Sequence, residues 1–83
     1  MSILKPCKGS DAFEFIPEKE KRLNLKKVVK RFKDVRISTD IVIVVKYRGV
    51  DVSIYPSGRM LIHTQDARKA GDIASALRRI IDV

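Results

Sequence analysis

The stretch that decides the fold is residues 52–64, Val-Ser-Ile-Tyr-Pro-Ser-Gly-Arg-Met-Leu-Ile-His-Thr. Apolar and polar residues alternate on both sides of Pro56-Ser57-Gly58, which predicts two antiparallel strands joined by a three-residue loop with Gly58 in the left-handed conformation. In this register Ile54 faces Met60 on the core side of the hairpin. The other side then carries a mixed set of apolar, aromatic and basic residues: Ser53, Tyr55, Arg59, Leu61 and His63.

The preceding segment, residues 41–47, is the strongest strand signal in the chain, Ile-Val-Ile-Val-Val-Lys-Tyr. Arg48-Gly49 follows and predicts a two-residue hairpin loop, because glycine tolerates the positive φ that such loops need. Lys46 then lies opposite Asp51, and a pair of opposite charges favours this register by about 0.2–1 kcal/mol. A slip of one residue would bury Asp51, so the register is well specified.

Two amphipathic helices are predicted. Residues 25–32 place Leu25, Val28, Val29 and Phe32 at helical spacing, with Asn24 as the N-cap, which predicts a helix of about ten residues. From Asp66 the apolar period changes from two to 3.6, and a second helix capped by Asp66 or Thr64 is expected to run nearly to Val83. Its apolar stripe consists of Ala70, Ile73, Ala74, Leu77, Ile80 and Ile81.

The order of elements predicts an α+β fold. Residues 12–16 alternate and stop at Pro17, as in a short strand, and residues 35–37 begin or extend another. We therefore expect the order β-α-β-β-β-α, with an antiparallel sheet of about four strands and two helices packed on one face. The 83 residues are expected to form a single domain, with residues 1–10 as a loose N-terminal arm that carries Cys7 as a free thiol.

The composition excludes several classes of function. No run approaches the roughly 18 apolar residues of a membrane span, and the N-terminus lacks the apolar stretch of a secretory signal, so a soluble cytoplasmic protein without membrane partners is expected. One Cys and one His form neither a disulfide nor a metal site, and no cofactor motif is present. No nucleophile has an identifiable base, and we predict a protein that is not an enzyme.

The formal charge of +8 is concentrated in the first half of the chain, where residues 1–36 hold eleven Lys and Arg against five Asp and Glu. A basic excess favours polyanionic partners through counterion release, with nucleic acid first and anionic membrane second. It is equally consistent with plain solubility. Five of these eleven cations fall on the polar face of the first predicted helix and account for much of the positive charge: Lys26, Lys27, Lys30, Arg31 and Lys33.

The sheet face that the helices leave open is the candidate binding surface. It combines apolar and aromatic residues with cations, and in such a surface apolar contact supplies affinity while the cations orient the partner. Strand propensity alone is the alternative explanation for the exposed Val and Tyr residues. The candidate binding residues are Val42, Val44, Lys46, Arg48, Tyr55, Arg59, Leu61 and His63, with Lys26, Lys27, Lys30 and Arg31 of the helix beside them.

Residues 24–82 resemble one repeat of the TATA-box-binding protein. The resemblance lies in Asn24-Leu-Lys-Lys-Val-Val29, in Ser53-Ile-Tyr-Pro-Ser-Gly-Arg-Met-Leu-Ile62 and in Ala76-Leu-Arg-Arg-Ile-Ile81. It implies a half-saddle fold in which Tyr55 falls where the family has a phenylalanine that wedges into a base step. Arg59, Leu61 and His63 fall where the family's basic and small residues reach the backbone and minor groove.

This chain departs from that family in ways that affect function. It has one repeat instead of two, the second wedge position aligns near Ser38, and Asp51 on the open face repels phosphate. Specific recognition of a TATA sequence is therefore not expected, although a homodimer would rebuild two repeats. A related half-saddle domain attached to a type of ribonuclease H grips hybrid or duplex substrate, so binding without sequence specificity stays open.

Two functions remain. The first is a small interaction domain that binds a protein, or a second copy of itself, through the open sheet face. The alternative is a module that binds nucleic acid without sequence specificity through the same face together with the basic first helix.

Overall fold

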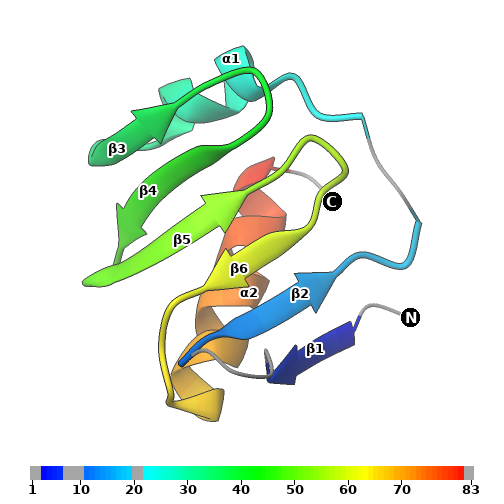
Figure 1. The fold of residues 1–83 in the computed structure, drawn as a ribbon, viewed down its shortest axis with the longest axis vertical. Coiled ribbons are helices and arrows are strands. Elements are labelled where there is room, and N and C mark those ends of the chain that lie inside the picture. The colour runs from blue at the N-terminus through cyan, green and yellow to red at the C-terminus, as the bar shows by residue number, and fades with distance from the viewer. Residues whose placement is uncertain (1–2, 7–10, 20–21, 82–83) are drawn as a thin grey trace.

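The computed structural model describes residues 3–6, 11–19 and 22–81. Within these residues the strands form one antiparallel six-stranded sheet in the order β1-β2-β6-β5-β4-β3 (Figure 1). The α+β class and the antiparallel sheet are confirmed, and the expected number of about four strands is wrong. The elements are β1 (Ile3–Pro6), β2 (Phe13–Ile16), α1 (Leu25–Val28), the 3₁₀ helix η1 (Val29–Arg31), β3 (Val35–Ser38), β4 (Ile43–Tyr47), β5 (Val50–Ile54), β6 (Met60–Ile62) and α2 (Ala67–Ile81).

The two edge strands account for the difference: β1 was not predicted, whereas β3 contains residues 35–37, which were expected to begin or extend a strand. β1 lies inside the predicted loose arm and pairs with β2, and β3 pairs with β4. Both are four residues long, and β1 ends in Pro6, which has no N–H for further pairing. Strands this short carry almost no periodic signal, which explains why β1 was not predicted. The expectation for Cys7 lies outside the described residues.

Both predicted hairpin registers are confirmed. Tyr47 pairs with Val50 and Lys46 with Asp51 across the first hairpin, and Ile54 pairs with Met60 across the second. The first loop is Arg48-Gly49, with φ angles of 51° and 78°, and Gly58 in the second loop has φ 93°. The two-residue loop thus has positive φ at both positions, the conformation that matches the twist of the paired strands.

β4 begins at Ile43, two residues later than predicted, because Thr39 organises the turn before it. The Thr39 hydroxyl accepts hydrogen bonds from the N–H groups of Ile41, at 3.3 Å, and Val42, at 3.0 Å. It also donates to the Val42 carbonyl at 2.8 Å. The β-forming residues at the start of the apolar run are therefore part of a defined turn, and Val42 directly precedes the strand.

The first helix is shorter than the predicted ten residues. Asn24 is the N-cap, since its Oδ1 accepts a hydrogen bond from the Lys26 N–H at 3.1 Å. Four α-helical residues and a three-residue 3₁₀ turn follow, and Phe32 is already extended. The Asp34 carbonyl accepts a hydrogen bond from the Lys46 N–H at 2.9 Å, so the chain must return to the sheet edge soon after η1. This tertiary pairing overrides the helical periodicity.

The second helix follows the prediction closely. Asp66 is its N-cap and accepts hydrogen bonds from the N–H groups of Arg68, at 3.0 Å, and Lys69, at 3.2 Å. The predicted stripe is buried at Ala70, Ile73, Ala74, Leu77 and Ile81.

Both helices pack on the same face of the sheet, as predicted. Leu25 and Val28 of α1 join the apolar stripe of α2 in one core cluster with the inward residues of the sheet, and α2 lies behind the sheet in Figure 1. No described helix covers the other face. None of the described helices is long and apolar enough to cross a membrane.

Candidate partner-binding face

The uncovered side of the sheet is the candidate site, and we call it the outer face. Strand residues alternate between the two sides, so the residues between the buried ones point away from α2. Ile37 belongs to this set because it pairs directly with Val44, and directly paired residues share a face. The outer face consists of Lys5, Glu14, Ile16, Ile37, Val44, Lys46, Asp51, Ser53, Tyr55, Arg59, Leu61 and His63.

One row of side chains crosses all six strands of the described sheet. In spatial order it consists of Ile37, Val44, Ser53, Leu61, Glu14 and Lys5. The middle of the row is packed by its own members, since Ser53 is only 7% exposed although no described element covers it. Val44 and Leu61 on either side of Ser53 are half-buried. The row is therefore apolar from the β3 edge to β6 and charged from β2 to β1.

Glu14, at the charged end of the row, neutralises Arg59, the main cation of the predicted site. Glu14 forms an ion pair with the Arg59 guanidinium, and its other carboxylate oxygen lies 3.8 Å from Lys5 Nζ. The Glu14 side chain is 16% exposed, whereas those of Arg59 and Lys5 are 54% and 55% exposed. Sequence reasoning missed Glu14. Along residues 12–16 the side chains alternate, so Glu14 points to the other side of the strand from Phe13 and Phe15. This alternation was sufficient to place Glu14 on the outer face.

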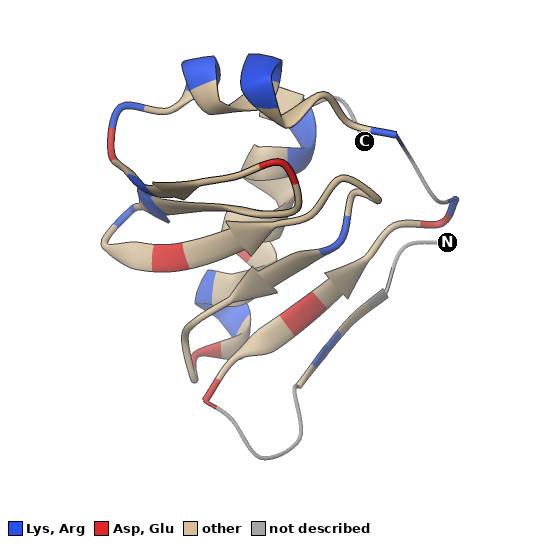
Figure 2. Ribbon diagram, turned by 45° about the horizontal axis from the view of Figure 1, so that its top comes forward, with Lys and Arg blue, Asp and Glu red and all other residues tan. Residues whose placement is uncertain are grey.

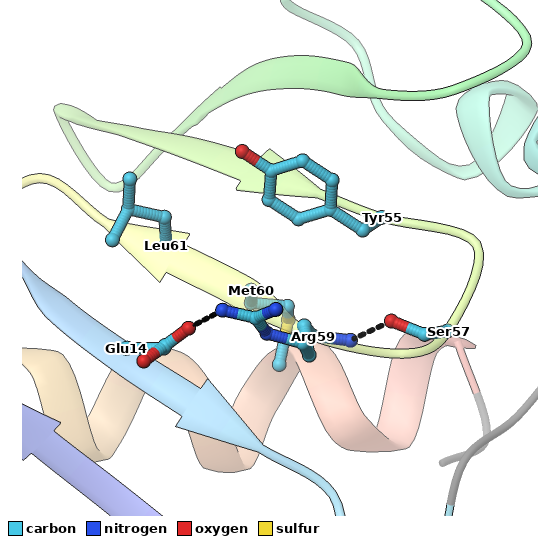
Figure 3. A pocket seen from close by; sticks show the side chains of 6 residues that line it. All are labelled: Glu14, Tyr55, Ser57, Arg59, Met60 and Leu61. Atoms are coloured by element: carbon cyan, nitrogen blue, oxygen red, sulfur yellow. Dashed lines mark hydrogen bonds and ion pairs between the residues drawn. The ribbon is translucent and has the colours of Figure 1, made fainter.

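A pocket of about 350 Å³ opens beside this ion pair, lined by Glu14, Tyr55, Ser57, Arg59, Met60 and Leu61. Figure 3 shows the Tyr55 ring and Leu61 on one side and the Arg59 guanidinium, directed at Glu14, on the other. The backbone N–H of Arg59 donates a hydrogen bond to Ser57 Oγ at 3.5 Å, which closes the loop end of the pocket. The pocket thus has an apolar wall and a polar wall whose charges are already paired.

The remaining predicted residues of the outer face lie at its other end. Lys46 is exposed opposite Asp51, and the His63 N–H donates to the Asp51 carbonyl at 3.0 Å. His63 Nε2 lies 3.4 Å from Ser53 Oγ. The histidine is exposed, and among the described residues its hydrogen bonds are to these strand neighbours, so it has a structural place in the sheet.

Arg48 is placed away from the other predicted site residues. Its positive φ carries the side chain around the turn, and its Cζ lies 5.4 Å from the centroid of the Tyr47 ring. Tyr47 packs against the core from the inner side of the sheet. Arg48 therefore leaves the outer face and interacts with an aromatic ring of the opposite side.

The cations of the first helical segment form a separate surface. Lys26, Lys27, Lys30 and Arg31 are exposed on α1 and η1, whose apolar residues enter the core on the inner side of the sheet. Both turns of this segment are basic in Figure 2. The structure therefore divides the predicted site into two surfaces on different sides of the molecule.

The described residues contain no group of His, Cys, Asp or Glu side chains that could hold a metal ion. Comparison with known proteins gives no match to a protein-family model, a curated protein or a solved structure.

Proposed function

We propose that this protein is a small non-catalytic interaction domain that binds a protein partner through the outer face. The observation that carries the proposal is the distribution of exposed apolar side chains. The most exposed large apolar residues of the described chain are Ile41, Ile37 and Tyr55, with 74%, 50% and 37% of their surface accessible. Ile37 and Tyr55 lie on the outer face, and Ile41 lies in the turn that leads into it.

The fixed backbone beneath these exposed side chains supports a binding role. Ile41 is 74% exposed although Thr39 fixes its turn with three hydrogen bonds. An exposed large apolar residue on a fixed backbone loses little conformational entropy when a partner covers it. Half-buried Val44 and Leu61 extend the apolar surface inward from this edge.

The charges of the outer face favour a protein over nucleic acid as its partner. Arg59 and Lys5 share Glu14, and Lys46 faces Asp51, so the face presents three cations beside two carboxylates. A phosphate backbone would have to displace Glu14 from Arg59 and approach Asp51. A protein surface with its own apolar patch meets neither cost.

The relationship to the TATA-box-binding protein remains part of this proposal. An open antiparallel sheet with both helices on one side supports it, and so does Tyr55 as the exposed aromatic residue of the second hairpin. If the two proteins are related, both use the open face of the sheet for binding, but the partner of this chain is a protein and not a bent duplex.

The test compares the wild-type chain with Ile37→Lys/Tyr55→Lys in sedimentation velocity and in affinity capture. A wild-type dimer that the variant does not form identifies a second copy as the partner. If the wild type is monomeric, a captured protein must be purified and must bind the wild type directly, with at least about tenfold weaker binding to the variant. Lys26→Gln/Lys27→Gln is the matched surface control and should bind as the wild type does.

A chain that stays monomeric at high concentration, and captures nothing that distinguishes the wild type from the outer-face variant, contradicts the proposal. Circular dichroism melts of both variants confirm that the fold is retained, because all four substituted residues are exposed.

A further inference from the structure

The second surface of the molecule holds most of its net charge. Residues 22–36, which we call the basic segment, contain seven Lys and Arg and one Asp, out of a formal charge of +8 for the whole chain. The single acidic residue, Asp34, pairs with Arg36 at 3.5 Å. The other cations of the segment are exposed and have no carboxylate partner among the described residues: Arg22, Lys26, Lys27, Lys30, Arg31 and Lys33.

Packing holds the backbone of this segment in place while its cations stay in solvent. Leu25 and Val28 are 5% and 8% exposed and join the core, so Lys26, Lys27 and Lys30 must point outward. The Phe32 ring meets the Tyr47 ring edge to face, with 6.4 Å between centroids. The basic cluster is therefore carried by a fixed scaffold and not by a mobile tail.

The same contacts bring one more cation to the surface. Arg48 lies over the Tyr47 ring, and Tyr47 touches Phe32 of the basic segment. The Asp34 carbonyl accepts the hydrogen bond from the Lys46 N–H, which fixes the β4–β5 turn beside the end of η1. Arg48 thus extends the cationic surface beyond the segment itself.

An anionic membrane fits this surface poorly. Peripheral amphipathic helices bind bilayers by inserting an exposed apolar face into the interface, while their basic face stays with the lipid headgroups. Here Leu25 and Val28 are buried, and Val29 and Phe32 pack against the core. The apolar face that a bilayer needs is already used by the fold, whereas a phosphate backbone needs only the cations.

We propose that the basic segment, with Arg48, binds the phosphate backbone of a nucleic-acid duplex without reading its sequence. Single strands are bound by stacking bases on exposed aromatic rings. Phe32 and Tyr47, the aromatic residues of this surface among those described, are half-buried and in contact with each other. Recognition therefore rests on charge density, which is highest on a duplex.

The number of unpaired cations sets the expected salt dependence. With about four of them at phosphates, the logarithm of the binding constant falls with the logarithm of the salt concentration with a slope of about −3.6. Binding then weakens about 150-fold between about 50 and 200 mM salt.

The experiment is fluorescence anisotropy of a labelled duplex of scrambled sequence, titrated with the full chain over this salt range. In the proposed site Lys26, Lys27 and Lys30 supply three of the roughly four phosphate contacts. Lys26→Gln/Lys27→Gln/Lys30→Gln should therefore bind more weakly and lose only about fourfold over the same range, because about one contact remains. Arg68→Gln/Lys69→Gln/Arg79→Gln on α2 removes the same charge from other exposed positions and should keep the wild-type slope.

Any one of four other outcomes overturns the proposal. Absence of duplex binding at the lowest salt excludes the site, and equal losses in the two triple variants show attraction to net charge alone. Loss of binding in Tyr55→Ala moves the site to the outer face. Vesicles of phosphatidylserine and phosphatidylcholine that bind as tightly as the duplex, with the same dependence on Lys26, Lys27 and Lys30, assign the surface to membranes.

Discussion

The ion pair between Glu14 and Arg59 decides how the outer face is interpreted, and a double-mutant cycle tests it. Glu14→Gln removes the carboxylate charge, Arg59→Met removes the guanidinium and keeps an apolar stem, and the double variant removes both. If the two side chains interact as the structure shows, the effects of the single substitutions on the free energy of unfolding are not additive.

The structure gives the magnitude. Pairs with both partners in solvent contribute about 0.2–1 kcal/mol, and hydrogen bonds to charged groups contribute about 1.5–3 kcal/mol. Glu14 is 16% exposed and Arg59 is 54% exposed, so the pair lies between these cases. We expect a coupling energy of about 1 kcal/mol. Lys5 lies 3.8 Å from the same carboxylate and is 55% exposed, and it should contribute less than Arg59 does.

The assay is urea unfolding followed by circular dichroism. For a domain of this size the free energy of unfolding falls by about 1 kcal/mol per molar urea, so the expected coupling shifts the midpoint by about 1 M relative to additivity. The cycle of Lys46→Gln and Asp51→Asn is the control, since both residues are exposed and should couple more weakly than Glu14 and Arg59, within the about 0.2–1 kcal/mol of exposed pairs. Additive effects at Glu14 and Arg59 would refute the pairing and return Arg59 to the list of cations available for phosphate.

Three further predictions concern the scaffold. Ile54→Val should lower the free energy of unfolding by about 0.5–1.5 kcal/mol because Ile54 is 0% exposed, whereas Ile37→Val, at a residue 50% exposed, should change it by less than about 0.5 kcal/mol; urea unfolding of both separates them. Asp66→Ala should cost about 1 kcal/mol through the lost cap of α2, measured as a lower thermal midpoint. Gly49→Ala should destabilise by about 1 kcal/mol although nothing lies within 4 Å of the added methyl group, because φ is +78°; an unchanged thermal midpoint would contradict this.

The part of the fold that was predictable from sequence is the part held by short loops. Arg48-Gly49 and the loop at Pro56-Ser57-Gly58 leave only one register that buries the apolar residues on both sides of each turn. The α2 helix was equally readable, because its cap and its stripe agree over 15 residues. Local pattern and tertiary packing demand the same structure in these segments.

The parts that were not predictable depend on contacts between distant segments. The pairing of β2 with β6 brings Phe15 beside Met60, and no turn between them specifies that register. Without it, the sequence does not relate Glu14 to Arg59, and the predicted outer face is more cationic than the observed one. The end of α1 is a similar case, because the hydrogen bond from the Lys46 N–H to the Asp34 carbonyl ends a helical pattern that continues in the sequence.

The separation of charge in the fold has a consequence for how the two proposed surfaces act together. The outer face lies on the side of the sheet away from α2, whereas Lys26, Lys27 and Lys30 lie on a segment whose apolar residues pack on the inner side. The two surfaces adjoin at the β3 edge, where Arg36 directly precedes Ile37. Electrostatic interactions in solvent decay over about 10 Å at 0.1 M salt, so away from that edge a partner on one surface exerts little force on a ligand at the other. Coupling between the sites would require an element with two discrete arrangements. The core between the surfaces is one continuous cluster, and a close-packed core has few alternative arrangements. Binding at the two surfaces should therefore be independent, and a chain with both activities would hold a protein partner at a nucleic-acid backbone without regulating either contact.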